Sequence, residues 1–197
     1  MNSSDIGQQY DEIAAWWNDR HMASKYGMQQ VERALAFAAP RGKALDVGCG
    51  AGGRFVRLLE ERGFEITGVD ASSKMISLAQ LNHPQSFFVK DDITSWDSEA
   101  QFDFILAWDC LFHLPLNMQK PVLAKLCRML TEQGVMIHTF GDDVGEHTDT
   151  WRGQEFRYSS IGISQNIELL HENGLSVLHL ELDQFPEKHV YAISRRS

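Results

Sequence analysis

The spacing of hydrophobic positions changes about 40 residues into the chain. Before that point, apolar side chains recur every three or four positions, for example from Ile6 to Trp17, which is typical of one face of an amphipathic helix. A second helix is expected from Ser24 to Ala39, because Pro40 ends the pattern. The first 40 residues therefore predict two helices.

From residue 43 onward, short apolar runs alternate with helical patterns. The predicted strands are Lys43–Val47, Phe64–Val69, Ser86–Val89, Phe102–Trp108, Gly134–Phe140, Leu175–Leu182 and His189–Ile193. The predicted helices include Ser73–Leu81, capped by Ser72 or Ser73, as well as Asn117–Leu130 and Ile163–Asn173. A strand–helix order repeated about five times predicts an α/β, doubly wound (Rossmann-like) fold with helices on both faces of a parallel sheet.

The last two strands are joined only by Asp183–Lys188, which is short enough for a hairpin. We therefore expect a seven-stranded, mostly parallel sheet that ends in an antiparallel hairpin. The polar stretch Gly141–Ser160 is too long for an ordinary connection, and its aromatic residues favour a packed lid over a disordered loop.

Length, charge and cysteine content narrow the function. A chain of 197 residues predicts one domain over 1–197. Its net charge of −9 makes a nucleic-acid partner unfavourable, because phosphates would be repelled. The chain shows no signal peptide and no long apolar run, and its three cysteines are far apart, so we expect a cytoplasmic protein without a membrane partner. Its histidines are dispersed, so no metal site is predicted. A small-molecule substrate and a monomer or homodimer are expected.

A glycine-rich turn follows the first predicted strand. Gly48, Gly50 and Gly53 match a dinucleotide fingerprint, whereas Gly48, Gly50 and Gly52 match the pattern Asp-x-Gly-x-Gly-x-Gly. Asp46 discriminates between the two, because its carboxylate would repel a pyrophosphate and attract an ammonium or sulfonium group. S-adenosylmethionine carries both of these cationic groups and no phosphate, so the turn favours that ligand over a nicotinamide dinucleotide.

Acidic residues also follow the next two predicted strands. Asp70 lies about 20 residues beyond the glycines, where a carboxylate can accept hydrogen bonds from ribose hydroxyls of either cofactor. Asp92 could accept from an adenine amine while Ile93 contacts the ring. A solvated turn is the alternative for Asp91 and Asp92.

With these motifs in order, the chain resembles the class I S-adenosylmethionine-dependent methyltransferases, in particular the small ubiquinone/menaquinone-methyltransferase-like type. The resemblance rests on Leu45–Gly53, Val69–Met75, Asp92-Ile93, Phe102–Pro115, the terminal hairpin and the opening Tyr10-Asp11-x-x-Ala14-x-x-Trp17. It implies that residues 1–40 cover the cofactor and that S-adenosyl-L-homocysteine is the product. The implied cofactor-binding residues are Asp46, Gly48 and Gly50 for the methionyl part, Asp70 for the ribose, Met75, Asp92 and Ile93 for the adenine, Trp108 at the floor and Tyr10 in the cover.

Candidates for the methyl acceptor are less specific. His113 follows the fourth strand and is the best candidate for a general base, although a structural histidine is an equal alternative. The 141–160 lid supplies the candidate substrate-binding residues His147, Arg152, Arg157 and Tyr158, whose arginines could hold a carboxylate or pair with nearby acidic residues. His138 and His189 are interpreted as structural.

Two other functions remain open at this point. An NAD(P)-dependent oxidoreductase would share the glycine turn, but Asp46 and the closing hairpin disfavour it. A non-catalytic S-adenosylmethionine-binding module would keep the cofactor site and lack an acceptor pocket. Transfer of a methyl group to a small molecule is the prediction that the motifs favour together.

Overall fold

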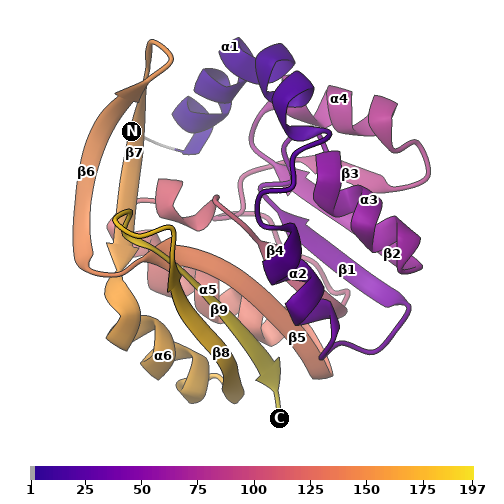
Figure 1. The fold of residues 1–197 in the computed structure, drawn as a ribbon, viewed down its shortest axis with the longest axis vertical. Coiled ribbons are helices and arrows are strands. Elements are labelled where there is room, and N and C mark those ends of the chain that lie inside the picture. The colour runs from indigo at the N-terminus through magenta and orange to yellow at the C-terminus, as the bar shows by residue number, and fades with distance from the viewer. Residues whose placement is uncertain (1–2) are drawn as a thin grey trace.

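A seven-stranded sheet forms the centre of the molecule in the computed structural model, which describes residues 3–197 (Figure 1). Its order is β3-β2-β1-β4-β5-β9-β8, and the first five strands run parallel, whereas β9 runs antiparallel to both of its neighbours. The strands are β1 (Gly42–Val47), β2 (Phe64–Asp70), β3 (Phe87–Lys90), β4 (Phe102–Ala107), β5 (Leu130–Gly141), β8 (Leu175–Asp183) and β9 (His189–Arg196). The predicted mostly parallel sheet and its terminal hairpin are confirmed.

Helices cover both faces of this sheet, as predicted. On one face, α2 (Met28–Leu35), α3 (Gly53–Glu61) and α4 (Ser73–Asn82) pack their apolar side chains against β1, β2 and β4. On the other face lie α5 (Leu116–Met129) and α6 (Gly162–Glu172). The long helix α1 (Ser3–His21) packs against α4 and the segment β7 (Gln154–Ile161), so it lies across one end of the sheet (Figure 1).

One predicted helix is shorter than expected. The helix predicted over residues 24–39 is α2 alone, because Gly27 adopts a left-handed conformation (φ 76°) immediately before Met28. Between β3 and β4 the described chain forms turns and no helix. Here the Asp92 side chain accepts a hydrogen bond from the Thr94 amide (2.8 Å), which favours a turn over a helical start. The strand–helix alternation therefore lacks a helix between β3 and β4.

The expected lid at residues 141–160 is a β-hairpin. Strand β6 (Val144–Trp151) pairs antiparallel with β7 through a two-residue turn at Arg152 and Gly153, both with positive φ (53° and 78°). Every residue of β6 is exposed. Its sequence therefore lacks the alternation of apolar and polar residues that indicates a strand with one buried face. Phe156 on β7 is 1% exposed and packs against apolar residues of α1, which fixes the hairpin beside that helix.

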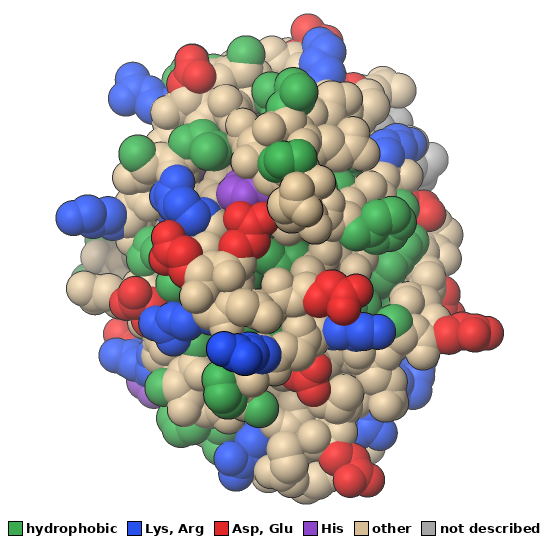
Figure 2. Space-filling model, turned by 90° about the vertical axis from the view of Figure 1, so that its right-hand side faces the viewer, with side chains coloured by type: hydrophobic (Ala, Val, Ile, Leu, Met, Phe, Trp, Pro, Cys, Tyr) green, Lys and Arg blue, Asp and Glu red, His purple; other side chains and the backbone are tan. Residues whose placement is uncertain are grey.

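The surface mixes charges of both signs. Figure 2 shows lysine and arginine side chains interspersed with aspartate and glutamate over the face that it presents. Across residues 3–197, every helix is too short or too polar to cross a membrane.

Candidate functional site

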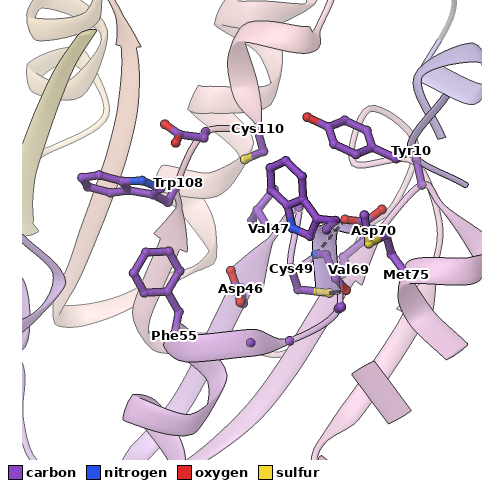
Figure 3. Close-up of a pocket in the computed structure, with 18 of the residues that line it drawn as sticks. Tyr10, Asp46, Val47, Cys49, Phe55, Val69, Asp70, Met75, Trp108 and Cys110 are labelled. Atoms are coloured by element: carbon purple, nitrogen blue, oxygen red, sulfur yellow. Dashed lines mark hydrogen bonds between the residues drawn. The ribbon is translucent and has the colours of Figure 1, made fainter. Parts of the chain in front are cut away.

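A pocket opens at the carboxyl ends of β1, β2 and β4, beneath α1. In parallel sheets, the loops that follow these strand ends form the usual ligand crevice. Figure 3 shows Phe55 and Trp108 on one side of the pocket, Tyr10, Asp70 and Met75 on the other, and Asp46 between them. The pocket is lined by every residue predicted to bind the cofactor, namely Tyr10, Asp46, Gly48, Gly50, Asp70, Met75, Asp92, Ile93 and Trp108.

The glycine turn follows β1 and brings its backbone against the neighbouring strand ends. The Gly48 amide donates to the Val69 carbonyl at 2.8 Å, which ties the turn to β2. Gly48 has a φ of 66°, and a Cβ at this position would lie 2.4 Å from the Cys110 Cβ. Only glycine fits there, because a side chain would collide with the segment after β4 and would also strain the backbone.

Asp70 connects this turn to β2. Its Oδ2 accepts from the Gly50 amide (2.9 Å) and its Oδ1 accepts from the Ser72 amide (2.8 Å). Burial raises the pKa of this carboxyl, although the two amides favour its charged form. The carboxylate is therefore held rigidly at the pocket wall, where ribose hydroxyls could donate to it.

The opening motif of the chain fixes α1 above the pocket. Asp11 accepts hydrogen bonds from the Lys74 amide (2.8 Å) and the Ser72 hydroxyl (2.5 Å) at the start of α4. Trp17 lies over the glycine turn, since a Cβ on Gly50 would be 3.3 Å from the indole Nε1. The aspartate thus docks the helix and the tryptophan covers the turn.

A buried carboxyl and a buried guanidinium interact electrostatically in the pocket. Asp46 is 4% exposed, and burial together with the nearby Asp70 carboxylate raises its pKa to about 8, although Arg54 opposes the shift. Arg54 follows the glycine turn on the buried side of α3, where it donates to the Tyr26 carbonyl (2.6 Å) and to Nδ1 of His21 (3.2 Å). Sequence reasoning missed Arg54, and the available signal was an arginine at a buried helix position directly after the turn.

His113, the predicted base, is buried in a fixed hydrogen-bond chain. Its Nδ1 is 2.8 Å from the Arg157 carbonyl, so Nδ1 carries the hydrogen, and its Nε2 accepts from the Tyr10 hydroxyl at 2.9 Å. Burial lowers the pKa of His113 to about 4 and raises that of Tyr10 well above its ordinary value. Both groups are neutral at pH 7, and together they link α1, β7 and the segment after β4.

The four candidate substrate-binding residues on the hairpin do not reach the pocket. Arg152 lies at the hairpin turn, with its guanidinium 3.9 Å from the centre of the Trp16 ring. Arg157 pairs with Glu146 at 3.5 Å, and His147 stacks on Tyr158. None of the four borders the pocket among the residues described there, because β6 and β7 pack beside α1 and α5 and leave the pocket mouth to α1.

Comparison with known proteins shows which family the sequence matches. The profile of a family described as "Methyltransferase domain" matches residues 18–180. A trans-aconitate 2-methyltransferase of Escherichia coli (strain 55989 / EAEC) is 33% identical over 146 residues, which cover 67% of this chain and 56% of that protein. Phosphoethanolamine N-methyltransferase 2 of Caenorhabditis elegans is 30% identical over 115 residues, or 55% of this chain and 26% of the relative.

Solved structures agree on the fold. The crystal structure of 1,6-didemethyltoxoflavin-N1-methyltransferase from Burkholderia thailandensis, with bound 1,6-didemethyltoxoflavin and S-adenosylhomocysteine, superposes with a TM-score of 0.72. It is 21% identical and the match covers 99% of this chain and 87% of that structure. The chain spans only a quarter to about half of the two curated relatives named above. The narrower resemblance to ubiquinone- and menaquinone-type enzymes stays a prediction. From its matched residues and its fold, the chain belongs to the methyltransferase-domain family.

Proposed function

We propose that this protein transfers a methyl group from S-adenosylmethionine to a small-molecule acceptor in the pocket beneath α1. The observation that carries the proposal is that Asp46 and Arg54 line the same pocket and interact electrostatically, and that Asp70 is held by backbone amides in its wall. An amino acid group fits Asp46 and Arg54, because its ammonium can contact the aspartate and its carboxylate can contact the arginine. The hydroxyls of a ribose can donate hydrogen bonds to Asp70.

The remaining pocket residues fit an adenine. Met75 is 1% exposed at the start of α4, and Ile93 follows β3 on the same side of the pocket. These two apolar side chains could contact the faces of the ring, and the neighbouring Asp92 could accept from its amine. When bound, S-adenosylmethionine supplies an electrophilic methyl group on a sulfonium. The protein's own task is then to align an acceptor with that methyl group and to exclude water.

Tyr10 and His113 contribute to closure. A pKa of about 4 gives the His113 imidazole little basicity at neutral pH, and its Nε2 is already occupied by the Tyr10 hydroxyl. These facts favour a role in holding α1 over the pocket. A role for His113 as general base stays a prediction, as does acceptor binding by His147, Arg152, Arg157 or Tyr158.

Calorimetric titration with S-adenosylmethionine, S-adenosylhomocysteine and NAD tests the cofactor. We expect micromolar binding of the first two and no binding of NAD, whose pyrophosphate would face Asp46. Binding of NAD alone would refute the proposal. Release of S-adenosylhomocysteine, measured by mass spectrometry with a panel of small acceptors, separates an enzyme from a module that only binds the cofactor.

A further inference from the structure

Three ionisable side chains, Asp183, His189 and Asp109, contact one another in series from the terminal hairpin to the pocket. Asp109, directly after Trp108, lines the pocket. Its Oδ1 is 2.9 Å from Nε2 of His189, and Nδ1 of the same ring contacts Oδ1 of Asp183. The Gln184 amide and the Tyr26 hydroxyl complete the surroundings, with 2.9 Å from Gln184 Nε2 to Nδ1 and 3.0 Å from Gln184 Nε2 to the Tyr26 oxygen.

The contacts of both His189 ring nitrogens favour the protonated, charged imidazolium. A neutral imidazole has a single N–H and could donate to only one of two carboxylates, whereas both ring nitrogens of His189 contact one. Burial alone would lower the pKa of His189, but its hydrogen bonds and charge attraction to Asp109 and Asp183 outweigh burial and raise it.

Asp109 is held in place by more than His189. Its backbone adopts a φ of 52°, a left-handed conformation that costs energy for most residues other than glycine. The Asp109 amide donates to the Thr139 hydroxyl (2.7 Å), and that hydroxyl donates back to Oδ1 of Asp109 at 3.3 Å. His189 and Thr139 thus both contact Oδ1, and the Tyr26 side chain also interacts with the Asp109 carboxyl.

The position of Asp109 is central to the pocket. Its charge contributes to the pKa shifts of Tyr10, Arg54 and His113, which lie at different parts of the pocket wall. Besides Asp109, the carboxyl side chains that line the described pocket are Asp46, Asp70, Asp91 and Asp92; its basic side chains are Arg54, His21 and His113. Arg54, Asp46, Asp70 and Asp92 are the residues that suit the cofactor, so Asp109 and Asp91 are the carboxyl side chains left for an acceptor, and they suit a group that donates hydrogen bonds.

We propose that Asp109 binds the methyl acceptor, that His189 and Asp183 act as positioning residues for it, and that the acceptor is an amine. The proposal deepens the proposed function and rests on it. An amine that has lost its extra proton to solvent can donate an N–H to the Asp109 carboxylate and direct its lone pair at the methyl carbon. When the amine gains the methyl group, the carbon–sulfur electron pair stays on sulfur and the positive charge passes to nitrogen. A fixed carboxylate beside that nitrogen stabilises the developing charge. A carboxylate acceptor would instead be repelled.

Matched acceptors test the chemistry. Each set keeps one carbon skeleton and varies the polar group: 2-phenylethylamine, 2-phenylethanol and phenylacetate; tryptamine, tryptophol and indole-3-acetate; hexylamine, hexanol and hexanoate. S-adenosylhomocysteine release is measured for each compound at equal concentration. We expect S-adenosylhomocysteine release to be about tenfold or more faster with the amine than with the alcohol or carboxylate in at least one set. This is the factor that one additional charge-assisted hydrogen bond would contribute.

The outcomes separate the two proposals. If the protein does not bind S-adenosylmethionine in calorimetry, the proposed function fails. If it binds the cofactor and prefers an alcohol or a carboxylate, or methylates no amine of the nine compounds, the amine proposal fails while the cofactor site stands.

Variants test the positioning chain. Asp109→Asn keeps the shape of the side chain and should lower kcat/KM for the amine about 10- to 100-fold, with the S-adenosylmethionine Kd unchanged within about threefold. His189→Ala should lower kcat/KM for the amine to the same extent. His189→Gln keeps one N–H for Asp109, so it should recover part of the lost kcat/KM. Asp183→Asn acts from outside the pocket and should change kcat/KM in the same direction.

His179→Ala is the matched control. His179 lies on the same hairpin and contacts Glu181 at 2.9 Å, but it does not line the pocket. It should leave amine kinetics unchanged. Equal losses from His179→Ala and His189→Ala, or an unaffected kcat/KM in both Asp109→Asn and Asp183→Asn, would overturn the role of this chain.

Discussion

Binding of S-adenosylmethionine should release a proton from Asp46. In the ligand-free protein, burial and the Asp70 carboxylate raise the pKa of Asp46 to about 8, even though Arg54 lies nearby. A free carboxyl with that pKa is mostly protonated at neutral pH. An ammonium group placed beside it favours the charged form, so the bound cofactor should lower this pKa and expel the proton.

The size of the effect follows from the pKa of about 8. At pH 7, about 0.9 protons should leave for each cofactor bound, because about nine in ten Asp46 side chains start protonated. Between pH 6 and pH 7, the apparent affinity should rise about tenfold, since the charged fraction rises by that factor. The α-amino group of the cofactor stays largely protonated in this range, as its ordinary pKa is about 7.7–8.0.

Calorimetry at pH 7 in two buffers with different ionisation enthalpies measures the released protons directly. Asp46→Asn cannot titrate, so it should bind weakly at both pH values and release no proton. Asp19→Asn, on the exposed side of α1, is the control and should behave as the wild type. Affinity that is equal at pH 6 and pH 7 in the wild type, or an unchanged pH slope in Asp46→Asn, would refute the pairing of Asp46 with an ammonium.

Three further outcomes follow from the site and the core. Asp70→Ala should weaken S-adenosylmethionine binding about 10- to 150-fold, as expected for loss of charge-assisted hydrogen bonds; calorimetry that shows a change below threefold would mean that Asp70 does not hold the ribose. Gly48→Ala should lower the melting temperature, because the new Cβ would lie 2.4 Å from the Cys110 Cβ at a φ of 66°, at a cost of about 1–3 kcal/mol; an unchanged thermal transition would show that the turn can relax. His138 has a buried pKa of about 4 against an ordinary 6.5, so the folded state binds fewer protons and stability should fall as pH drops from 6.5 toward 4. His138→Leu should remove part of that slope, up to about 1.4 kcal/mol per pH unit, in urea titrations at several pH values; an identical slope in the variant would assign the acid sensitivity to other groups.

The sequence alone predicted the sheet and the residues around the glycine turn that line the pocket. Both depend on local patterns. Apolar runs separated by helical periods predict strands and crossovers, and the glycines before Gly53 allow a turn that other residues cannot form. The carboxyl ends of neighbouring parallel strands lie at the same edge of a sheet. Once β1 and β2 were predicted, Asp46 and Asp70 were therefore expected to lie close together. The covering role of α1 came from resemblance, and Asp11 supplies its physical basis by capping α4.

Only the tertiary structure decided which other residues face the pocket and what holds them there. Arg54 on α3 and Asp109 after β4 line the pocket, His189 on β9 contacts Asp109, and no spacing in the sequence relates the three. The pKa of His189 is raised by two carboxyl groups that β8 and the segment after β4 bring to its two ring nitrogens. Likewise, the exposed strand β6 carries no periodic signal, so its pairing with β7 depends on the burial of that partner against α1. Local periodicity fixes the elements, whereas the state of a buried charge depends on neighbours that only folding brings within a few ångströms.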